Sequence, residues 1–317
     1  MEKMKFASTR SAYGKALLKL GKENPNIVVM DADLACSTKT ALFGKEFPDR
    51  FFNMGIAEAN MMGFAAGLAI SGKIVYVSTF AMFAVLRPYE QIRNSIASQN
   101  LNVKIVATHA GISVGEDGLS HQAIEDVAIL RAIPNMKIFV PADAVSAEKM
   151  VEEASKILGP VYIRLSRPDT PTIYNPNDYV FHKGQANILK DATEARIAFI
   201  AAGNMVYEAL KVSERFENEG ISTIVADFSS IKPLDKEKLI SIARRTKLII
   251  TMEEHTVIGG LGSAVCETLS EEYPAPVIRI GINDLFGESG SPAALFQQFG
   301  LNSEEVYRRL LKKIRYL

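Results

Sequence analysis

Glu58 is the first candidate for chemistry, because residues 54–70 (MGIAEANMMGFAAGLAI) hold no other charged side chain. A helix that is apolar on all sides is typically buried, so this carboxylate is expected to lie out of water. Because an isolated buried carboxylate is costly, it must be paired, protonated or hydrogen-bonded to a ligand. The structural alternative is that Asn53 caps the helix and Glu58 only complements the helix dipole at an exposed end.

Two phenylalanines follow a predicted strand in residues 77–86 (VSTFAMFAVL). Phe80 and Phe83 lie just beyond the carboxyl end of that strand, the edge at which open α/β sheets bind ligands. Flat aromatic rings at this edge could bind a heterocycle by stacking. The alternative is ordinary core packing, which is common for aromatic residues at helical spacing.

A glycine-rich loop occupies residues 109–126 (HAGISVGEDGLSHQAIED), between a predicted strand and a helix. Loops at strand ends often carry function. His121 can exchange protons with hydroxyl groups near pH 7, and Asp117 can hold a hydroxyl or fix an imidazole tautomer. A metal site needs three or four ligands at suitable spacing, and only His109, Asp117 and His121 are available locally, so no metal is expected in this chain.

Arginines stand at the ends of predicted elements, at Arg10, Arg164 and Arg167. The rigid fork of arginine suits phosphate and carboxylate groups. Singly, each arginine would form a surface ion pair. If they converge at one edge of the sheet, they would form an anion clamp.

The glycines at 259, 260 and 262 open a helix after a strand, as in a dinucleotide-binding fingerprint. Val265, however, stands where the third glycine of that fingerprint belongs. We therefore interpret this segment as a tight strand-to-helix turn and not as a nucleotide site.

The composition excludes several classes of protein. The chain has 317 residues, enough for about two domains. Lys plus Arg and Asp plus Glu both number 36, so the basic excess of a nucleic-acid binder is missing. No apolar run approaches the roughly 20 residues of a membrane span, and two cysteines form neither a disulfide framework nor a zinc site. We expect a soluble, cytoplasmic protein that binds neither nucleic acid nor membrane.

Short β-branched runs alternate with longer amphipathic stretches, the pattern of parallel strands joined by crossover helices. The sequence therefore predicts an α/β protein with two domains, each an open, largely parallel sheet flanked by helices. The predicted boundaries are 1–167 for the first domain, 168–180 for a Pro-rich linker and 181–317 for the second domain. The predicted strands are 26–30, 74–80, 104–109, 137–140, 161–165, 180–189, 197–202, 223–228, 248–252 and 277–280. The main predicted helices are 10–22, 56–70, 83–98, 124–132, 144–157 and 302–316.

Taken together, the motifs resemble the C-terminal portion of a transketolase. The pyrimidine-binding domain of that family carries a Gly-Ile-Ala-Glu helix, here residues 55–58, and a Thr-Phe-x-x-Phe stretch, here residues 79–83. It also carries a Gly-Glu-Asp-Gly-x-x-His-Gln loop, here residues 115–122. The resemblance extends over residues 10–167 and more loosely over the second domain, and it implies a pyrimidine-binding domain followed by a transketolase C-terminal-like domain.

The resemblance also implies a role for each candidate residue. Glu58 would hydrogen-bond the aminopyrimidine of thiamin diphosphate and, with His121, serve in catalysis. Phe80 and Phe83 would stack on the ring. The implied substrate-binding residues are Arg10, Ser37, His109, Asp117, His121 and Arg167. The implied reaction transfers a two-carbon ketol unit from a ketose phosphate to an aldose phosphate, a reaction of the pentose phosphate pathway.

Two features depart from the family pattern. Leu86 stands where many relatives have a third aromatic residue. The diphosphate and magnesium motif, Gly-Asp-Gly followed further on by Asn, is absent from this sequence. The resemblance therefore implies one half of a split enzyme. Its N-terminal partner subunit would hold Mg²⁺ or a similar divalent cation, and the expected assembly is an α2β2 heterotetramer.

Three alternatives remain. The β subunit of a 2-oxo acid dehydrogenase shares the Glu58 helix, but its loop usually carries His-Ser-Gln where this chain has His121 and Gln122. A deoxyxylulose phosphate synthase contains an equivalent half, normally in one fused chain. A non-catalytic regulatory paralogue would have no need to keep Glu58, Phe83 and His121 together. The preferred sugar phosphates and the role of the second domain are not predicted by the sequence.

Overall fold

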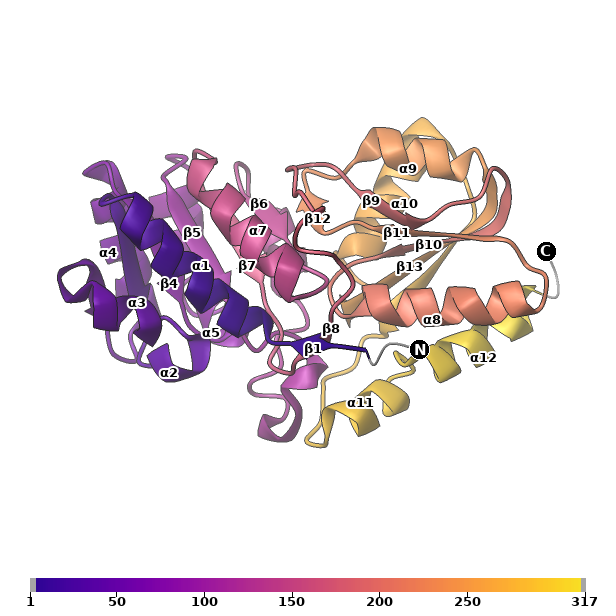
Figure 1. The fold of residues 1–317 in the computed structure, drawn as a ribbon, viewed down its shortest axis with the longest axis horizontal. Coiled ribbons are helices and arrows are strands. Elements are labelled where there is room, and N and C mark those ends of the chain that lie inside the picture. Colours follow the sequence, from indigo (N-terminus) through magenta and orange to yellow (C-terminus); the bar gives the residue numbers. More distant parts are fainter. Residues whose placement is uncertain (1–3, 315–317) are drawn as a thin grey trace.

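The alternation of short apolar runs and amphipathic stretches folds into two α/β domains that lie side by side (Figure 1). The computed structural model describes residues 4–314. Each domain is a mostly parallel sheet with helices on both faces, so the predicted fold class is confirmed. Within residues 4–314, no helix is both long and apolar enough to cross a membrane.

The first sheet has the strand order β12-β6-β7-β5-β4-β2-β3. All neighbouring strands are parallel except β12 and β6. The strands β2, β5 and β7 are buried along their whole length, as expected for a sheet covered on both faces. The bounds are β2 (Ile27–Asp31), β3 (Phe51–Asn53), β4 (Ile74–Ser78), β5 (Val103–Ala107), β6 (Lys137–Phe139), β7 (Val161–Arg164) and β12 (Ser230–Lys232).

Two helices, α1 and α7, pack together on one face of this sheet, and α4 packs with η2 on the other (Figure 1). Aliphatic side chains spaced along α1 and α7 form a shared core against the strands. The helices of the first domain are α1 (Thr9–Glu23), α2 (Ala35–Thr38), α3 (Ala41–Glu46), η1 (Pro48–Arg50), α4 (Glu58–Ile70), α5 (Ala81–Val85), η2 (Gln91–Ala97), η3 (Ile112–Asp117), α6 (Asp126–Arg131) and α7 (Ala144–Lys156).

The second sheet has the order β14-β13-β10-β11-β9, with only β9 antiparallel to its neighbour. Helices α8 and α12 cover one face, and α9 and α10 cover the other (Figure 1). The strands are β9 (Asn187–Lys190), β10 (Ala195–Ala201), β11 (Thr223–Asp227), β13 (Thr246–Thr256) and β14 (Val277–Ile282). The helices are α8 (Met205–Asn218), α9 (Lys236–Ala243), α10 (Leu261–Glu272), α11 (Pro292–Gln298) and α12 (Ser303–Ile314).

The two domains are tied together at their junction. Strand β12 follows β11 in the chain but joins the sheet of the first domain. Strand β8 (Thr170–Pro171), inside the predicted linker, pairs with β1 (Phe6–Ala7). We keep the boundaries 1–167, 168–180 and 181–317 as a proposal, with the addition that β12 crosses back over them.

Several element bounds differ from those predicted. The helix predicted at 83–98 is wrong as one element: α5 ends at Val85, and a π-helical stretch begins only at Gln91. Pro88 lies between them, and a proline lacks the amide hydrogen that a continuous helix needs. The strand predicted at 180–189 is confined to β9, because a turn with Gly184 at φ +78° precedes it. The expectation that the last helix reaches Tyr316 lies outside the described residues.

Helix α4 is buried on one side only. Met61, Met62 and Ala65 face the core, whereas Phe64 and Ile70 are exposed. The prediction of a helix buried all round is therefore wrong for this chain by itself. The outer face of α4 is also largely apolar, and this face is exposed to solvent in the isolated chain.

Candidate active site

The candidate residues gather at the carboxyl edge of the first sheet. Phe80 follows β4, His109 follows β5 and Arg167 follows β7, and these three strands are parallel neighbours. Arg10 lies in the first turn of α1, and Glu58 is the first residue of α4. Residues far apart in the sequence therefore meet at one edge, as the strand pattern predicts.

Glu58 is buried, as expected, with 4% of its surface exposed. Its Oε1 accepts a hydrogen bond from Arg87 Nη1 at 2.8 Å. Its second oxygen makes no hydrogen bond with any residue in the described range 4–314. The cap of α4 is Ala57 and not Asn53, so the predicted cap is wrong. The carboxylate thus keeps one acceptor oxygen for another molecule.

Arg87 is a member of the site that the sequence reasoning missed. Its guanidinium carbon lies 4.5 Å from the centre of the Phe83 ring, so it links that ring to Glu58. The side chain is 51% exposed. The one signal for Arg87 in the sequence was that a lone buried carboxylate needs a positively charged partner.

Phe80 and Phe83 occupy different environments. The Phe80 ring is buried and stacks on His109, with 3.7 Å between ring centres. Phe83 is half-buried, and its ring meets the edge of His121 at 5.2 Å. The two phenylalanine rings are 6.2 Å apart and nearly parallel. Phe83 is therefore the more exposed of the two rings, and it already contacts Arg87 and His121.

His109 lies near several positively charged side chains. It is buried and has φ +57°, and its Nδ1 lies 2.8 Å from Thr108 Oγ1. Burial, and after it the positive charges of Arg10 and Arg167, lower the pKa of His109 to about 3, with a smaller contribution from Lys39. His109 is therefore neutral at pH 7 and can both donate and accept hydrogen bonds.

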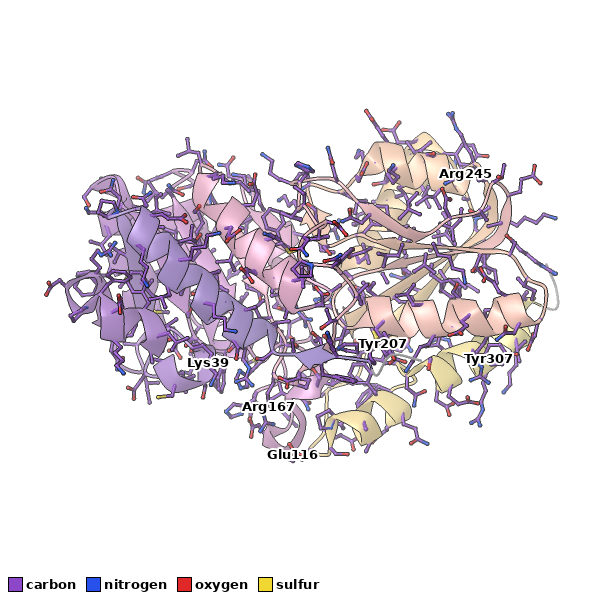
Figure 2. The ribbon with its side chains drawn as sticks, viewed as in Figure 1. Lys39, Glu116, Arg167, Tyr207, Arg245 and Tyr307 are labelled. Atoms are coloured by element: carbon purple, nitrogen blue, oxygen red, sulfur yellow. The ribbon has the colours of Figure 1, made fainter. Side chains whose placement is uncertain are left out.

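Arg10 and Arg167 meet beside the glycine-rich loop. Arg10 donates to the carbonyl oxygens of Ser37 at 2.9 Å and of Arg167 at 2.7 Å. Arg167 donates to the carbonyl of Val114 and to Glu116 Oε2. Figure 2 shows Arg167 close to Glu116 below the junction of the domains. Two of the three predicted arginines thus converge.

Arg164 does not join this cluster. Its Nε donates to Asp126 Oδ2 at 2.8 Å, and both side chains are buried between the domains. An anion clamp therefore rests on Arg10 and Arg167, with Lys39 as a cation that the sequence reasoning missed. Lys39 lies on the same side of the molecule as Arg167 (Figure 2).

The glycine-rich loop brings His121 against Phe83 and leaves Asp117 exposed. His121 is partly exposed, and its Nδ1 lies 3.0 Å from Ser120 Oγ. Asp117 is exposed, and its carboxylate makes no hydrogen bond within residues 4–314. Gly115 and Gly118 have φ of +85° and +73°, which few other residues tolerate. The loop conformation therefore explains its glycines.

The glycine-rich turn at 259–262 is a strand-to-helix turn, as predicted. Glu253 accepts hydrogen bonds from the amides of Leu261 at 2.7 Å and Gly262 at 2.8 Å. A phosphate at the start of α10 would need these same amides. The chain fills that position with its own carboxylate.

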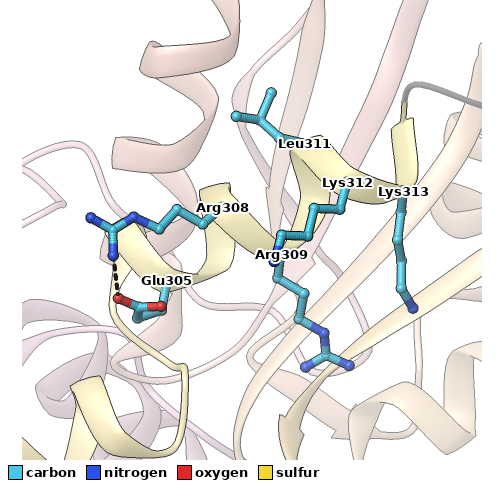
Figure 3. Close-up of a pocket in the computed structure, with 6 residues that line it drawn as sticks. All are labelled: Glu305, Arg308, Arg309, Leu311, Lys312 and Lys313. Atoms are coloured by element: carbon cyan, nitrogen blue, oxygen red, sulfur yellow. Dashed lines mark hydrogen bonds and ion pairs between the residues drawn. The ribbon is translucent and has the colours of Figure 1, made fainter.

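A hollow of about 800 Å³ on α12 is lined by none of the candidate residues; Figure 3 shows the residues that do line it. Arg308 pairs there with Glu304 and Glu305, each at 3.0 Å. Such pairs at helical spacing are typical of a solvated helix face. The residues that line the hollow are Glu305, Arg308, Arg309, Leu311, Lys312 and Lys313.

The transketolase pyrimidine-binding domain family matches residues 5–172, and the transketolase C-terminal domain family matches residues 184–306. The chain belongs to the transketolase family. It is 47% identical to a Methanocaldococcus jannaschii protein named as a transketolase C-terminal section, over 98% of this chain and 97% of that protein. The transketolase chain described here therefore corresponds to the C-terminal section of such an enzyme.

Solved transketolase structures agree with this assignment. A structure titled as a split-gene transketolase, inactive β4 tetramer, is 53% identical and has a TM-score of 0.89, covering 97% of this chain and 98% of that one. The Campylobacter jejuni transketolase is 26% identical with a TM-score of 0.82, covering 98% of this chain and 47% of that one. Human transketolase is 39% identical over 94% of this chain and 48% of its own length. The present chain thus spans about half the length of these two transketolases.

Proposed function

We propose that this chain is the C-terminal subunit of a split transketolase, which transfers a two-carbon ketol unit from a ketose phosphate to an aldose phosphate. The observation that carries the proposal is the buried Glu58 with one free oxygen, held by Arg87, which also contacts the Phe83 ring that His121 meets. The family match supports the use of thiamin diphosphate.

The residues of this chain suit the aminopyrimidine end of that cofactor. Thiamin diphosphate supplies the carbanion chemistry, and the protein supplies position and electrostatics. Glu58 would hold a proton at a ring nitrogen with its free oxygen, while Arg87 donates a hydrogen bond to the other oxygen and so orients the carboxylate. The half-buried ring of Phe83 would orient the cofactor by stacking, with Phe80 behind His109 as support.

The cationic group suits the anionic end of a sugar phosphate. Arg10, Arg167 and Lys39 lie near enough to the neutral His109 to lower its pKa, so a dianion that binds beside His109 would gain from their positive charge. Ser37 lies beside Arg10, and its backbone carbonyl orients that guanidinium. Asp117 and His121 would hold donor hydroxyls from the loop, His121 as the proton-exchanging group.

The open face of α4 supports a requirement for a partner. Ile56 and Ile70 are 75% and 65% exposed, and Phe64 and two glycines lie between them. Apolar patches of this kind mark interaction surfaces. We propose that this face is covered in an α2β2 heterotetramer, whose N-terminal subunit brings the diphosphate site and its Mg²⁺. The relative whose title gives an inactive β4 tetramer is in keeping with this proposal.

Reconstitution tests the proposed function. Ketol transfer is measured for this chain alone and after mixing with an N-terminal transketolase section, thiamin diphosphate and Mg²⁺. We expect no transfer by the isolated chain and turnover on the order of 1–100 s⁻¹ in the mixture. Robust transfer by the isolated chain would contradict partner dependence. No transfer in a mixture that forms the complex would favour a non-catalytic paralogue.

The donor is identified in the same assay by comparing substrates. Relatives that this chain matches over nearly their whole length are named for different donors: 6-deoxy-6-sulfo-D-fructose in a Clostridium subunit, 38% identical over 94% of this chain and 92% of that subunit, and apulose 4-phosphate in a Phocaeicola vulgatus subunit, 39% identical over 96% and 97%. A pentulose phosphate, a hexulose phosphate and a sulfonated ketose are therefore compared by kcat/KM. We expect preference for a phosphate, because Arg10, Lys39 and Arg167 gain more from a dianion than from a sulfonate monoanion.

A further inference from the structure

The loop that carries Asp117 and His121 lies against the second domain. Ile112 and Ile124, at the two ends of the loop, belong to the apolar core of that domain. Turn η3 packs on α11, which lies beside it below the domain junction (Figure 1). The inner side of a loop of the first domain is therefore built from residues of the second.

Glycines of the loop touch the second domain so closely that an added Cβ atom would make a clash or a tight contact. A Cβ atom at Gly111 would lie 2.2 Å from Glu254 Oε1, and one at Gly118 would lie 2.4 Å from Ser289 Oγ. A Cβ atom at Gly115 would lie 3.2 Å from Pro292. The backbone of the loop thus follows the surface of residues 254 and 289–292.

Buried hydrogen bonds fix the same contact. Glu254 is 5% exposed, and its Oε1 accepts from the amide of Ser113 at 2.7 Å. Its Oε2 accepts from Asn204 Nδ2 at 2.9 Å. From the loop, Gln122 Nε2 donates to the carbonyl of Glu288 at 2.9 Å. Because buried polar groups need partners, the loop can keep this conformation only while the second domain supplies them.

We propose that the second domain holds the substrate loop in place, with Glu254 as the main positioning residue. Glu254 acts through the amide of Ser113 and the turn η3, and so sets where Asp117 and His121 stand. A misplacement of about 1 Å can cost about 10²-fold in rate, so a loop held from behind matters for catalysis. What the loop binds rests on the proposed transketolase function; how the loop is held does not.

Glu254→Ala tests the proposal, and Glu253→Ala is the matched control. Glu253 is the preceding residue on β13 and equally buried, but it caps α10 and does not reach the loop. Two quantities are measured: amide hydrogen exchange of residues 111–121 in the full chain alone, and kcat and KM for the donor in the reconstituted complex. We expect Glu254→Ala to speed exchange in the loop at least tenfold and to lower kcat/KM about 100-fold, while the affinity for thiamin diphosphate changes less than twofold.

In the conservative variant Glu254→Gln, the amide exchange rate of residues 111–121 should stay within about threefold of the wild type. An amide oxygen still accepts from Ser113, and Asn204 can turn its amide over. Glu253→Ala should lower the melting temperature but leave exchange in residues 111–121 within twofold. If Glu254→Ala fails to fold, Asn204→Ala, which removes only the second support of Glu254, should still speed loop exchange about threefold.

The proposal is overturned if loop exchange rises no more in Glu254→Ala than in Glu253→Ala, or if Asn204→Ala leaves it unchanged. These measurements on the full chain alone need no activity. A wild-type complex without ketol transfer would overturn the proposed function, and loop exchange would still decide whether Glu254 positions the loop.

Discussion

Two buried carboxylates flank the candidate site, and they use their oxygens differently. Glu58 and Glu254 are almost equally buried, at 4% and 5% exposed. Glu254 has both oxygens filled, by the Ser113 amide and by Asn204. Glu58 has one oxygen filled, by an arginine that is itself half-exposed. Burial alone therefore does not distinguish them, but satisfaction of the hydrogen-bonding oxygens does.

The difference suggests separate roles for these two residues. Glu254 is fully satisfied within the chain and stabilises a conformation, because its partners would be costly to leave unpaired. Glu58 keeps a free oxygen in a buried position at the sheet edge, and buried carboxylates with unused acceptors are enriched at functional sites. Glu254 thus belongs to the support of the loop, and Glu58 to the chemistry.

The largest expected effect comes from Glu58→Gln. An amide can hydrogen-bond a ring nitrogen but cannot share a proton with it, so kcat of the reconstituted enzyme should fall about 10²- to 10⁴-fold. Hydrogen exchange at the cofactor's thiazolium C2 position, measured in the complex, should slow in parallel. Unchanged C2 exchange would remove Glu58 from proton transfer and break the comparison.

Glu253→Gln is the control for that substitution. Glu253 is buried and has both oxygens filled by the backbone amides at the start of α10, and it lies outside the cluster around Phe83. We expect its substitution to leave kcat within about threefold. The unfolding free energy of Glu58→Gln in the isolated chain should change by less than about 1 kcal/mol, because the one ion pair it loses is half-exposed.

Much of this site was predictable from the sequence. The isolated acid in an apolar helix predicted a buried Glu58, and the strand pattern predicted that Phe83 and His121 would share one sheet edge. Both inferences depend on local periodicity and on the rule that parallel strands end at a common edge. They hold because residues 54–70 and residues 77–86 each contain one main element and its boundary, so that their structure follows from nearby residues.

The remainder depends on long-range contacts that leave no local signal. Arg87 can reach Glu58 only because α5 ends shortly before Pro88 and because α4 begins at Glu58 itself. The support of the loop comes from residues 254 and 287–292, more than a hundred positions further along the chain. The open face of α4 was misjudged because an apolar stretch looks the same whether its own chain or a partner covers it.

A smaller effect is expected at His109, which belongs to the candidate site, as Glu58 does. Its pKa is about 3 in the folded chain and about 6.5 when unfolded, so the unfolded chain binds a proton first as the pH falls. The neutral imidazole therefore contributes full stability above about pH 6.5, and this contribution is lost between about pH 6.5 and 3.

Urea unfolding at pH 7 and pH 5 measures this effect. Between these pH values the wild type should lose about 1–2 kcal/mol more than His109→Asn, which has no titrating ring. Equal losses would contradict a lowered pKa at His109 and hence the buried, neutral imidazole that the folded chain is expected to hold.

The smallest effect, and the one that sharpens the comparison most, is the coupling between Arg87 and Glu58. A double-mutant cycle with Arg87→Ala and Glu58→Gln should give about 0.5–1 kcal/mol in unfolding free energy, because water screens a half-exposed pair. The buried contact between Asn204 and Glu254, in the cycle of Asn204→Ala and Glu254→Ala, should give about 1.5–3 kcal/mol. A weak coupling is expected of a carboxylate whose other oxygen is kept for a ligand, because its ion pair with Arg87 then contributes little to the stability of the fold. Were the Arg87 coupling the larger of the two, Glu58 would be a structural ion-pair residue, and the chemistry assigned to it would fail.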